Sequence, residues 1–108
     1  MTISVNALTF DAVIGILDFE RETPQRVQID AAIGYTFDQK TYIDYAEVTA
    51  LIKSTIIKGR FGLIEEALET LQKTLKTAFP LIDTLSLSIT KPDILPDATV
   101  TLSEQYKF

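Results

Sequence analysis

Lys91 occupies an unusual position for a charged residue. It follows Leu85, Leu87 and Ile89 at two-residue spacing, and in a β-strand such spacing puts these side chains on one face. The lysine therefore lies at the end of an apolar face, and Pro92 fixes the direction of the chain just after it. Two interpretations are open. The side chain either extends its charged end into water from a buried stem, or it presents a partly desolvated amine that can transfer protons.

Three further side chains are candidate functional groups, although each has an ordinary structural explanation. Tyr45 lies in the first turn of a predicted helix, where it is either core filler or a phenol that relays a proton. Glu65 lies in the first turn of the next predicted helix. It is either a solvated residue that favours the helix dipole, or a carboxylate that accepts two parallel N–H bonds from an amidine-like group. Glu20 belongs to a charged run that is by default a solvated loop.

The residue types that are missing restrict the chemistry further. The sequence contains no Cys and no His, which excludes thiolate nucleophiles, disulfides, zinc–sulfur sites, Ser–His triads and imidazole–metal sites. Carboxylate, lysine and tyrosine remain for acid–base work. A Mg²⁺ site made of carboxylates alone stays open, but no tight cluster of Asp and Glu demands one, so we expect a site without metal.

Length and charge indicate the class of protein. The chain has 108 residues and a net charge of -5, and we expect residues 1–108 to form a single domain. An acidic surface repels phosphates, so nucleic acid and anionic membranes are poor candidate partners. No stretch is apolar and long enough to span a bilayer, and the first residues lack the pattern of a signal peptide. We therefore expect a cytoplasmic protein.

Apolar periodicity predicts four strands and two helices. The strands are residues 3–10, 27–35, 82–91 and a last one with Ala98, Val100 and Leu102 on one face. Asp44 is a candidate N-cap with Glu47 as its box partner, and a helix then runs to about residue 58. A second helix runs over residues 63–79, with Pro80 closing it.

The order β-β-α-α-β-β favours an antiparallel sheet with both helices on one face, which is the α+β class. Such a sheet leaves a Thr- and Ser-rich face and two edges uncovered. We therefore expect the chain to form an oligomer, with barrel closure across subunits as one way to cover the sheet.

Five segments in this order resemble the dihydroneopterin aldolase family and, more loosely, the related dihydroneopterin triphosphate epimerases. The resemblance spans nearly the whole chain, and its segments are Val13-Ile14-Gly15-Ile16-Leu17-Asp18-Phe19-Glu20, Gln25-Arg26-Val27-Gln28-Ile29-Asp30, Ile43-Asp44-Tyr45-Ala46-Glu47-Val48, Phe61-Gly62-Leu63-Ile64-Glu65 and Ser88-Ile89-Thr90-Lys91-Pro92. The resemblance implies the tunnelling fold, in which subunits join their sheets into a ring of four, often stacked as eight. Active sites then lie between neighbouring subunits, and the reaction needs neither metal nor cofactor.

The resemblance also implies roles for individual residues. Glu65 would bind the 2-amino and N3 edge of a pterin, with the backbone at Ile64 assisting and Ile43 also contacting the substrate. Lys91 and Tyr45 would manage protons during retro-aldol cleavage of 7,8-dihydroneopterin in folate biosynthesis, and Glu20 would orient Lys91 or a water. Tyr45 would come from the neighbouring subunit. The products would be 6-hydroxymethyl-7,8-dihydropterin and glycolaldehyde.

Two departures from the family pattern leave alternatives open. The connection before the first predicted helix is short, and Tyr42 replaces the threonine that often stands in this segment. This loop normally walls the pterin pocket in the family, so a non-catalytic pterin-binding protein remains as one alternative to the aldolase. A 2′-epimerase of dihydroneopterin or its triphosphate remains as another, because the same retro-aldol intermediate could recombine on the other face.

Overall fold

The computed structural model describes all 108 residues. In chain order its elements are β1 (Thr2–Ala12), α1 (Asp18–Glu22), β2 (Gln25–Tyr35), α2 (Tyr45–Gly59), α3 (Ile64–Ala78), β3 (Ile82–Lys91) and β4 (Val100–Lys107). The strands form one sheet in the order β1-β2-β3-β4, and every neighbouring pair is antiparallel. Apart from the short helix α1, this confirms the predicted order and the α+β class.

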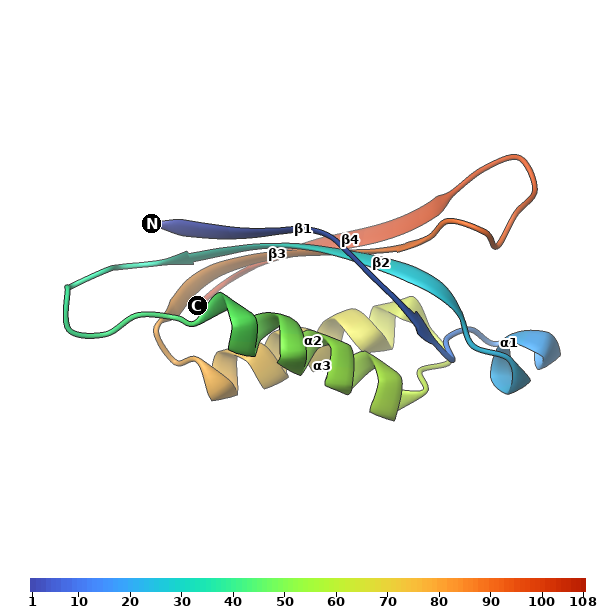
Figure 1. Cartoon of the computed structure of the whole chain (residues 1–108), viewed down its shortest axis with the longest axis horizontal. Coiled ribbons are helices and arrows are strands. Elements are labelled where there is room, and N and C mark those ends of the chain that lie inside the picture. Colours follow the sequence, from blue (N-terminus) through green and yellow to red (C-terminus); the bar gives the residue numbers. More distant parts are fainter.

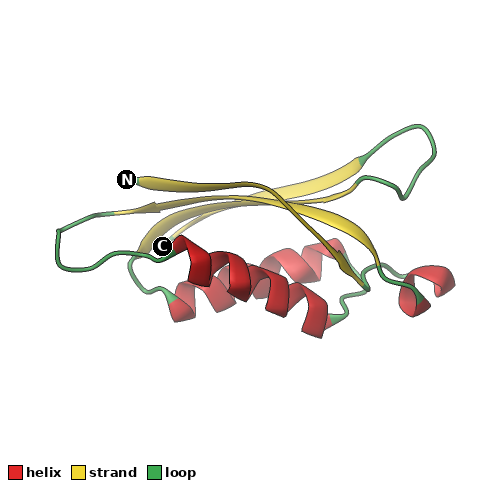
Figure 2. Ribbon diagram, in the orientation of Figure 1, coloured by secondary structure: helices red, strands yellow, loops and turns green.

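Helices α2 and α3 pack side by side on one face of the sheet (Figures 1 and 2). Helix α2 contacts β1, and α3 contacts β3 and β4. No helix covers the opposite face of the sheet (Figure 2). None of the helices has both the length and the apolar character needed to cross a membrane.

The core lies between the sheet and the two long helices, as the alternating pattern predicts. The sheet contributes one face of β2 and one face of β3, which are buried at Val27, Ile29, Ala31, Ile33, Tyr35, Ile82, Leu85, Leu87 and Ile89. The helices contribute the apolar stripes Val48, Ile52 and Ile56, and Ile64, Ala67, Leu68, Leu71 and Leu75. Each fully buried Ile or Leu side chain contributes about 1.5–3 kcal/mol, so this interlayer core holds the helices in place.

The first turn of α2 differs in part from the prediction. The Asp44 side chain caps the helix by accepting a hydrogen bond from the Ala46 N–H at 2.9 Å, whereas the predicted return bond from Glu47 is not formed. Tyr45 is 68 % exposed. The interpretation of Tyr45 as core filler is therefore wrong, because the apolar stripe of α2 begins only at Val48.

Helix α1 replaces the solvated charged loop expected at residues 18–22. Its first turn is closed by the Leu17 carbonyl, which accepts from the Glu20 and Arg21 N–H groups at 2.9 and 3.1 Å. The residue at the cap is a leucine, which carries none of the side-chain oxygens that mark a helix start in a sequence. The pattern therefore gave no sign of this helix.

The strand ends also differ slightly from the prediction. Strand β1 extends to Ala12, two residues past its predicted end, and β4 begins at Val100 rather than at Ala98. Within β1, a bulge at Ala7 (φ 55°) shifts the register between Val5 and Leu8. The Asp30 carboxylate holds this bulge by accepting from the Ala7 N–H at 2.8 Å.

One backbone contact joins the segment before α1 to the link between the long helices. The Gly15 N–H donates to the Phe61 carbonyl at 2.9 Å. Phe61 lies three residues before Ile64, the first residue of α3. The contact therefore brings the start of α3 next to the chain that leads into α1, which is the region of the candidate site.

Candidate active site

Glu20 and Lys91 form a buried ion pair where β3 ends beside α1. The Lys91 Nζ donates to Glu20 Oε2 at 2.7 Å. Glu20 is 4 % exposed and Lys91 is 7 % exposed. The pair joins residues that are 71 positions apart in the sequence. Because a buried charge is tolerated only when it is paired, each residue offsets the cost of burying the other.

The position of Lys91 follows from the register of β3. Ile89 pairs with Ile29 in the middle of the sheet, and Lys91 follows two residues later on the same buried face. The predicted orientation of Lys91 is confirmed. Its charged end does not extend freely into water, because its partner Glu20 is also buried.

The Glu20 carboxylate is held by three donors from three parts of the chain. Besides Lys91, the side chain of Gln25 donates from Nε2 to Oε2 at 2.9 Å, and the Leu17 N–H donates to Oε1 at 3.3 Å. Gln25 is the first residue of β2, and Leu17 precedes α1. The expectation of a solvated Glu20 is therefore wrong, because contacts made by β2 and β3 bury it.

These contacts decide the charge of Glu20. Burial by itself raises the pKa of this carboxyl group, whereas the hydrogen bonds from Lys91, Gln25 and the Leu17 N–H, together with the charge of Lys91, lower it. The net effect is a pKa below the usual value of a glutamate. Glu20 is therefore a carboxylate at neutral pH and acts as an acceptor toward Lys91.

Ile64 and Glu65 lie at the start of α3, beside the Gly15–Phe61 contact. Ile64 is buried, whereas the Glu65 side chain is exposed. Leu63 at the cap position gives no side-chain hydrogen bond to the helix. Glu65 and the first N–H groups of α3 are therefore available to a ligand at the end of the molecule where Glu20 lies.

Ile43 and Tyr45 lie at the opposite end of the molecule. Helix α2 has 15 residues, and its last residue precedes the link that contacts Gly15. A helix of this length spans about 21 Å, so Tyr45 is about 20 Å from that link. In Figure 1, α2 starts far from α1 and runs toward it. One chain thus brings Glu20, Lys91 and the start of α3 together, but it leaves Ile43 and Tyr45 apart from them.

Comparison with a protein-family model shows the family of the chain. Residues 3–103 match the model described as FolB, dihydroneopterin aldolase. The chain belongs to this family. Membership confirms the resemblance seen in the sequence, and it confirms the predicted activity class, a lyase of folate biosynthesis that acts on dihydroneopterin.

Solved structures of FolB and dihydroneopterin aldolase proteins share the fold of this chain. A FolB structure from Vibrio cholerae is 24 % identical, with a TM-score of 0.90 and coverage of 100 % of this chain and 98 % of that one. The dihydroneopterin aldolase of E. coli, solved with neopterin, is 18 % identical, with a TM-score of 0.89 and coverage of 98 % of both chains. That of Burkholderia, bound to guanine, is 18 % identical, with a TM-score of 0.82 and coverage of 100 % and 91 %. At these identities the likeness establishes the tunnelling fold. No curated protein sequence matches this chain significantly.

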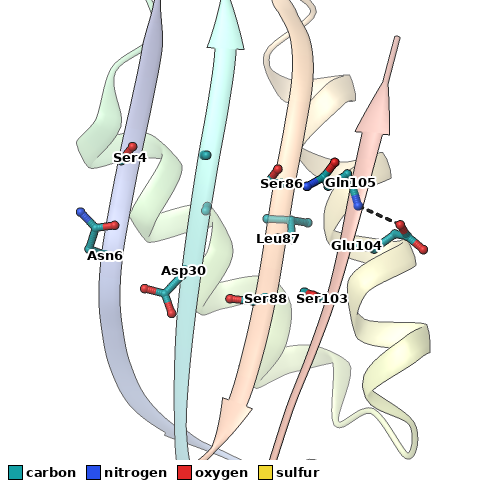
Figure 3. Close-up of a pocket in the computed structure, with 11 residues that line it drawn as sticks. Ser4, Asn6, Asp30, Ser86, Leu87, Ser88, Ser103, Glu104 and Gln105 are labelled. Carbon is teal, nitrogen blue, oxygen red and sulfur yellow. Dashed lines mark hydrogen bonds between the residues drawn. The ribbon is translucent and has the colours of Figure 1, made fainter.

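The largest hollow of this FolB-family chain lies elsewhere, on the sheet face that no helix covers (Figure 3). It has a volume of about 450 Å³ and is lined mainly by short polar side chains, among them Ser4, Asn6, Asp30, Ser86 and Ser88. A smaller hollow of about 280 Å³ borders Glu20 and Gln25. The hollow on the uncovered sheet face contains no buried ion pair and no helix start, so we place the candidate active site at Glu20 and Lys91.

The structure adds two residues that the sequence interpretation did not assign to the site. Gln25 contacts Glu20 directly, and Gly15 (φ 132°) lies against the Glu20 carboxylate. The only sequence signal for them was their presence in the segments that resemble the family. No group of three or more His, Cys, Asp or Glu residues could hold a metal ion.

Proposed function

We propose that this chain cleaves 7,8-dihydroneopterin by a retro-aldol reaction, giving 6-hydroxymethyl-7,8-dihydropterin and glycolaldehyde. The observation that carries this proposal is the buried Glu20–Lys91 pair, 2.7 Å between Nζ and Oε2, in a FolB-family chain. In the proposal Lys91, Tyr45 and Glu20 are the catalytic residues, and the reaction takes place in the cytoplasm.

In the proposed reaction the substrate supplies its own electron sink. The proton-handling groups of the site, Lys91 and Tyr45, take the 2′-hydroxyl proton directly or through a water, and the bond between C1′ and C2′ then breaks. Its electron pair moves into the imine of the dihydropterin ring, and the former 2′-oxygen becomes the aldehyde oxygen of glycolaldehyde. C1′ then takes up a proton from the same groups and becomes the hydroxymethyl group, which returns them to their starting state. No Schiff base with the enzyme forms.

Lys91 is suited to the proton transfers because its partner leaves most of the amine free. An ammonium group has three N–H donors, and Glu20 accepts one of them. The remaining donors can serve the substrate or a bound water, and Glu20 fixes their direction. Tyr45 supplies a phenol as the second proton-handling group.

Glu65 is the proposed anchor for the pterin ring. Its exposed carboxylate can accept two parallel N–H bonds from the 2-amino group and the neighbouring ring N–H. Neopterin and guanine, the ligands in the E. coli and Burkholderia structures, both carry such an edge. The backbone at Ile64 supports the ring at the uncapped start of α3. The side chain of Ile43 is buried in the core of its own chain, so Ile43 contacts the substrate through its backbone, from the second half of the site.

Each complete site requires two subunits in this proposal. Tyr45 and Ile43 lie at one end of the chain, and Glu20, Lys91 and Glu65 lie at the other end. A head-to-tail contact between copies joins the two halves, and such heterologous contacts form a ring when the rotation between copies closes. Large exposed apolar side chains occur near both ends, at Phe37, Tyr42 and Tyr45, and at Ile16, Leu17, Phe19 and Leu63. Their exposure supports a contact between copies, and we propose a ring of four, alone or stacked as eight.

Incubation of the purified protein with 7,8-dihydroneopterin tests the function. We expect glycolaldehyde in amounts equal to 6-hydroxymethyl-7,8-dihydropterin. Chromatography that separates the 2′-epimers detects the alternative epimerase reaction in the same samples. A protein that binds the pterin but releases no product at high concentration would contradict the aldolase and support the non-catalytic alternative.

Matched variants at the start of α3 test the anchor. Glu65→Gln removes the charge that binds the two N–H groups, and we expect pterin binding to weaken at least about tenfold, since hydrogen bonds to charged groups contribute about 1.5–3 kcal/mol. Glu66→Gln makes the same change at the next exposed residue and should bind like the unaltered protein. Equal binding by both variants contradicts the role of Glu65.

A further inference from the structure

Gln25 contacts the Glu20–Lys91 pair from the first position of β2. It is half-buried and pairs with Ala12 at the end of β1. Its Nε2 atom donates to the Ile14 carbonyl at 2.8 Å and to Glu20 Oε2 at 2.9 Å. These bonds use both hydrogens of the amide nitrogen, and they connect the Glu20 carboxylate to the backbone at the end of the sheet.

Gln25 and Lys91 donate to the same oxygen of Glu20. Lys91 Nζ lies 2.7 Å from Oε2, and Gln25 Nε2 lies 2.9 Å from it. Two donors on one oxygen, with the Leu17 N–H on the other, restrict rotation of the carboxylate about its last side-chain bond. Without Gln25, the carboxylate could turn and take the lysine amine with it.

We propose that Gln25 is a positioning residue for the reaction, which holds the Glu20 carboxylate in the orientation that directs the Lys91 amine toward the substrate. This inference rests on the function proposed above and extends it by one residue. Gln25 itself does not touch the substrate. Its effect on the reaction is transmitted through Glu20, so it must appear in the ionisation of Glu20 as well as in the rate.

The contact with Gln25 also helps to keep Glu20 ionised. Burial raises the pKa of Glu20, and the hydrogen bond from Gln25 is among those that lower it, after that from Lys91. Removing the Gln25 donor therefore raises the pKa of Glu20. If the reaction requires ionised Glu20, the acid limb of the pH profile moves to higher pH. Lys91 from β3 is the charged group that contacts the carboxylate. Arg26 on β2 and Asp93 after β3 line the hollow that borders Glu20, and Arg21, the next residue on α1, donates to the Gly15 carbonyl at 3.2 Å.

Gln25→Met and Gln28→Met form a matched pair for the test. Both residues are half-buried glutamines on β2, and only Gln25 contacts Glu20. For Gln25→Met we expect kcat to fall about tenfold, in line with loss of a hydrogen bond to a charged group, and KM to change less than about twofold. We also expect the acid limb of the pH profile of kcat/KM to move to higher pH, by roughly half a pH unit to one unit. Gln28→Met should match the unaltered enzyme.

Two results would overturn the proposal. One is a Gln25→Met enzyme whose kcat and acid limb equal those of Gln28→Met. The other is a loss of kcat with an unmoved acid limb, which a merely structural defect would give. If Gln25→Met does not fold, Gln25→Asn replaces it, because the shorter amide cannot reach both acceptors, and the same criteria apply.

A titration of the resting enzyme separates this inference from the proposed function. Carboxyl ¹³C NMR follows Glu20 directly, and we expect a higher pKa in the Gln25 variant than in the Gln28 variant. Equal titration curves overturn the positioning role whatever the substrate is. Failure of the proposed function would instead appear as an unaltered enzyme that releases no glycolaldehyde.

Discussion

The α-carbon of Gly15 faces the carboxylate of Glu20 so closely that no side chain fits between them. A Cβ atom at residue 15 would overlap the carboxyl carbon and both oxygens of Glu20. The backbone of Gly15 also has a φ of 132°, which residues with a side chain rarely adopt. Glycine at this position therefore lets the chain turn from β1 into α1 and lets Glu20 reach Lys91.

Gly15→Ala should damage both stability and activity. The alanine would have to displace Glu20 and adopt a strained backbone, and we expect the free energy of unfolding to fall by about 3 kcal/mol. Urea denaturation measures this loss, and glycolaldehyde release measures the loss of turnover. Gly62→Ala is the control, because a Cβ there would meet only Ile16 Cγ2, at 3.6 Å. Similar losses in both variants would contradict the role given to Gly15.

The ion pair predicts that Lys91 variants lose stability as well as turnover. Lys91→Met leaves the Glu20 carboxylate buried without its cation, and removing one partner of a buried pair costs about 3–5 kcal/mol. The double variant Lys91→Met with Glu20→Gln removes both charges, so we expect it to recover at least about half of that stability. We expect both the single and the double variant to lack turnover, because each lacks the Lys91 amine.

Denaturation curves and product assays of the same samples separate these two effects. A double variant as unstable as Lys91→Met would show that the buried charge of Glu20 is not the cause of the loss. A double variant with turnover near that of the unaltered enzyme would contradict the catalytic roles of both residues.

Glu20 also gives stability a defined dependence on pH. Its folded-state pKa lies below the usual value of 4.5, so the folded state binds this proton less readily than the unfolded chain does. The stabilisation from ionised Glu20 is therefore fully present above the unfolded pKa and is lost as pH falls through the folded pKa. We expect the difference in unfolding free energy between the unaltered protein and Glu20→Gln to be constant above about pH 5.5 and to shrink below about pH 4.5. A difference that does not change down to pH 3 would contradict the ion pair.

The pattern of the sequence was sufficient to place Lys91 but not Glu20. Alternation along β3 fixes the face on which Lys91 lies, because side chains alternate strictly in a strand. Burial of Glu20 depends on the end of a strand 71 residues away and on a helix whose cap residue, Leu17, carries no capping side chain. Neither feature leaves a periodic signal near residue 20.

A sequence pattern is also insufficient to predict whether the Tyr45 side chain is buried or exposed. An apolar or aromatic residue at the start of an amphipathic helix can pack inside its own chain or against another one, and periodicity does not distinguish these cases. Tyr45 is exposed in the chain, at the end of α2 that lies away from α1 (Figure 1). The resemblance to the family supplied the expectation of a shared site, which the pattern of this sequence could not supply.

Mixing two inactive variants tests the shared site directly. Tyr45→Phe damages one half-site, and Lys91→Met damages the other, so each pure oligomer should have little activity. When the two chains are unfolded together and reassembled in equal amounts, random head-to-tail contacts pair two unaltered halves at about a quarter of the sites. We therefore expect the mixture to regain about a quarter of the unaltered activity. Mixing the folded oligomers without reassembly is the control and should regain none. If Tyr45 and Lys91 acted within one chain, no mixture would contain an intact site, and activity would stay at the level of the separate variants.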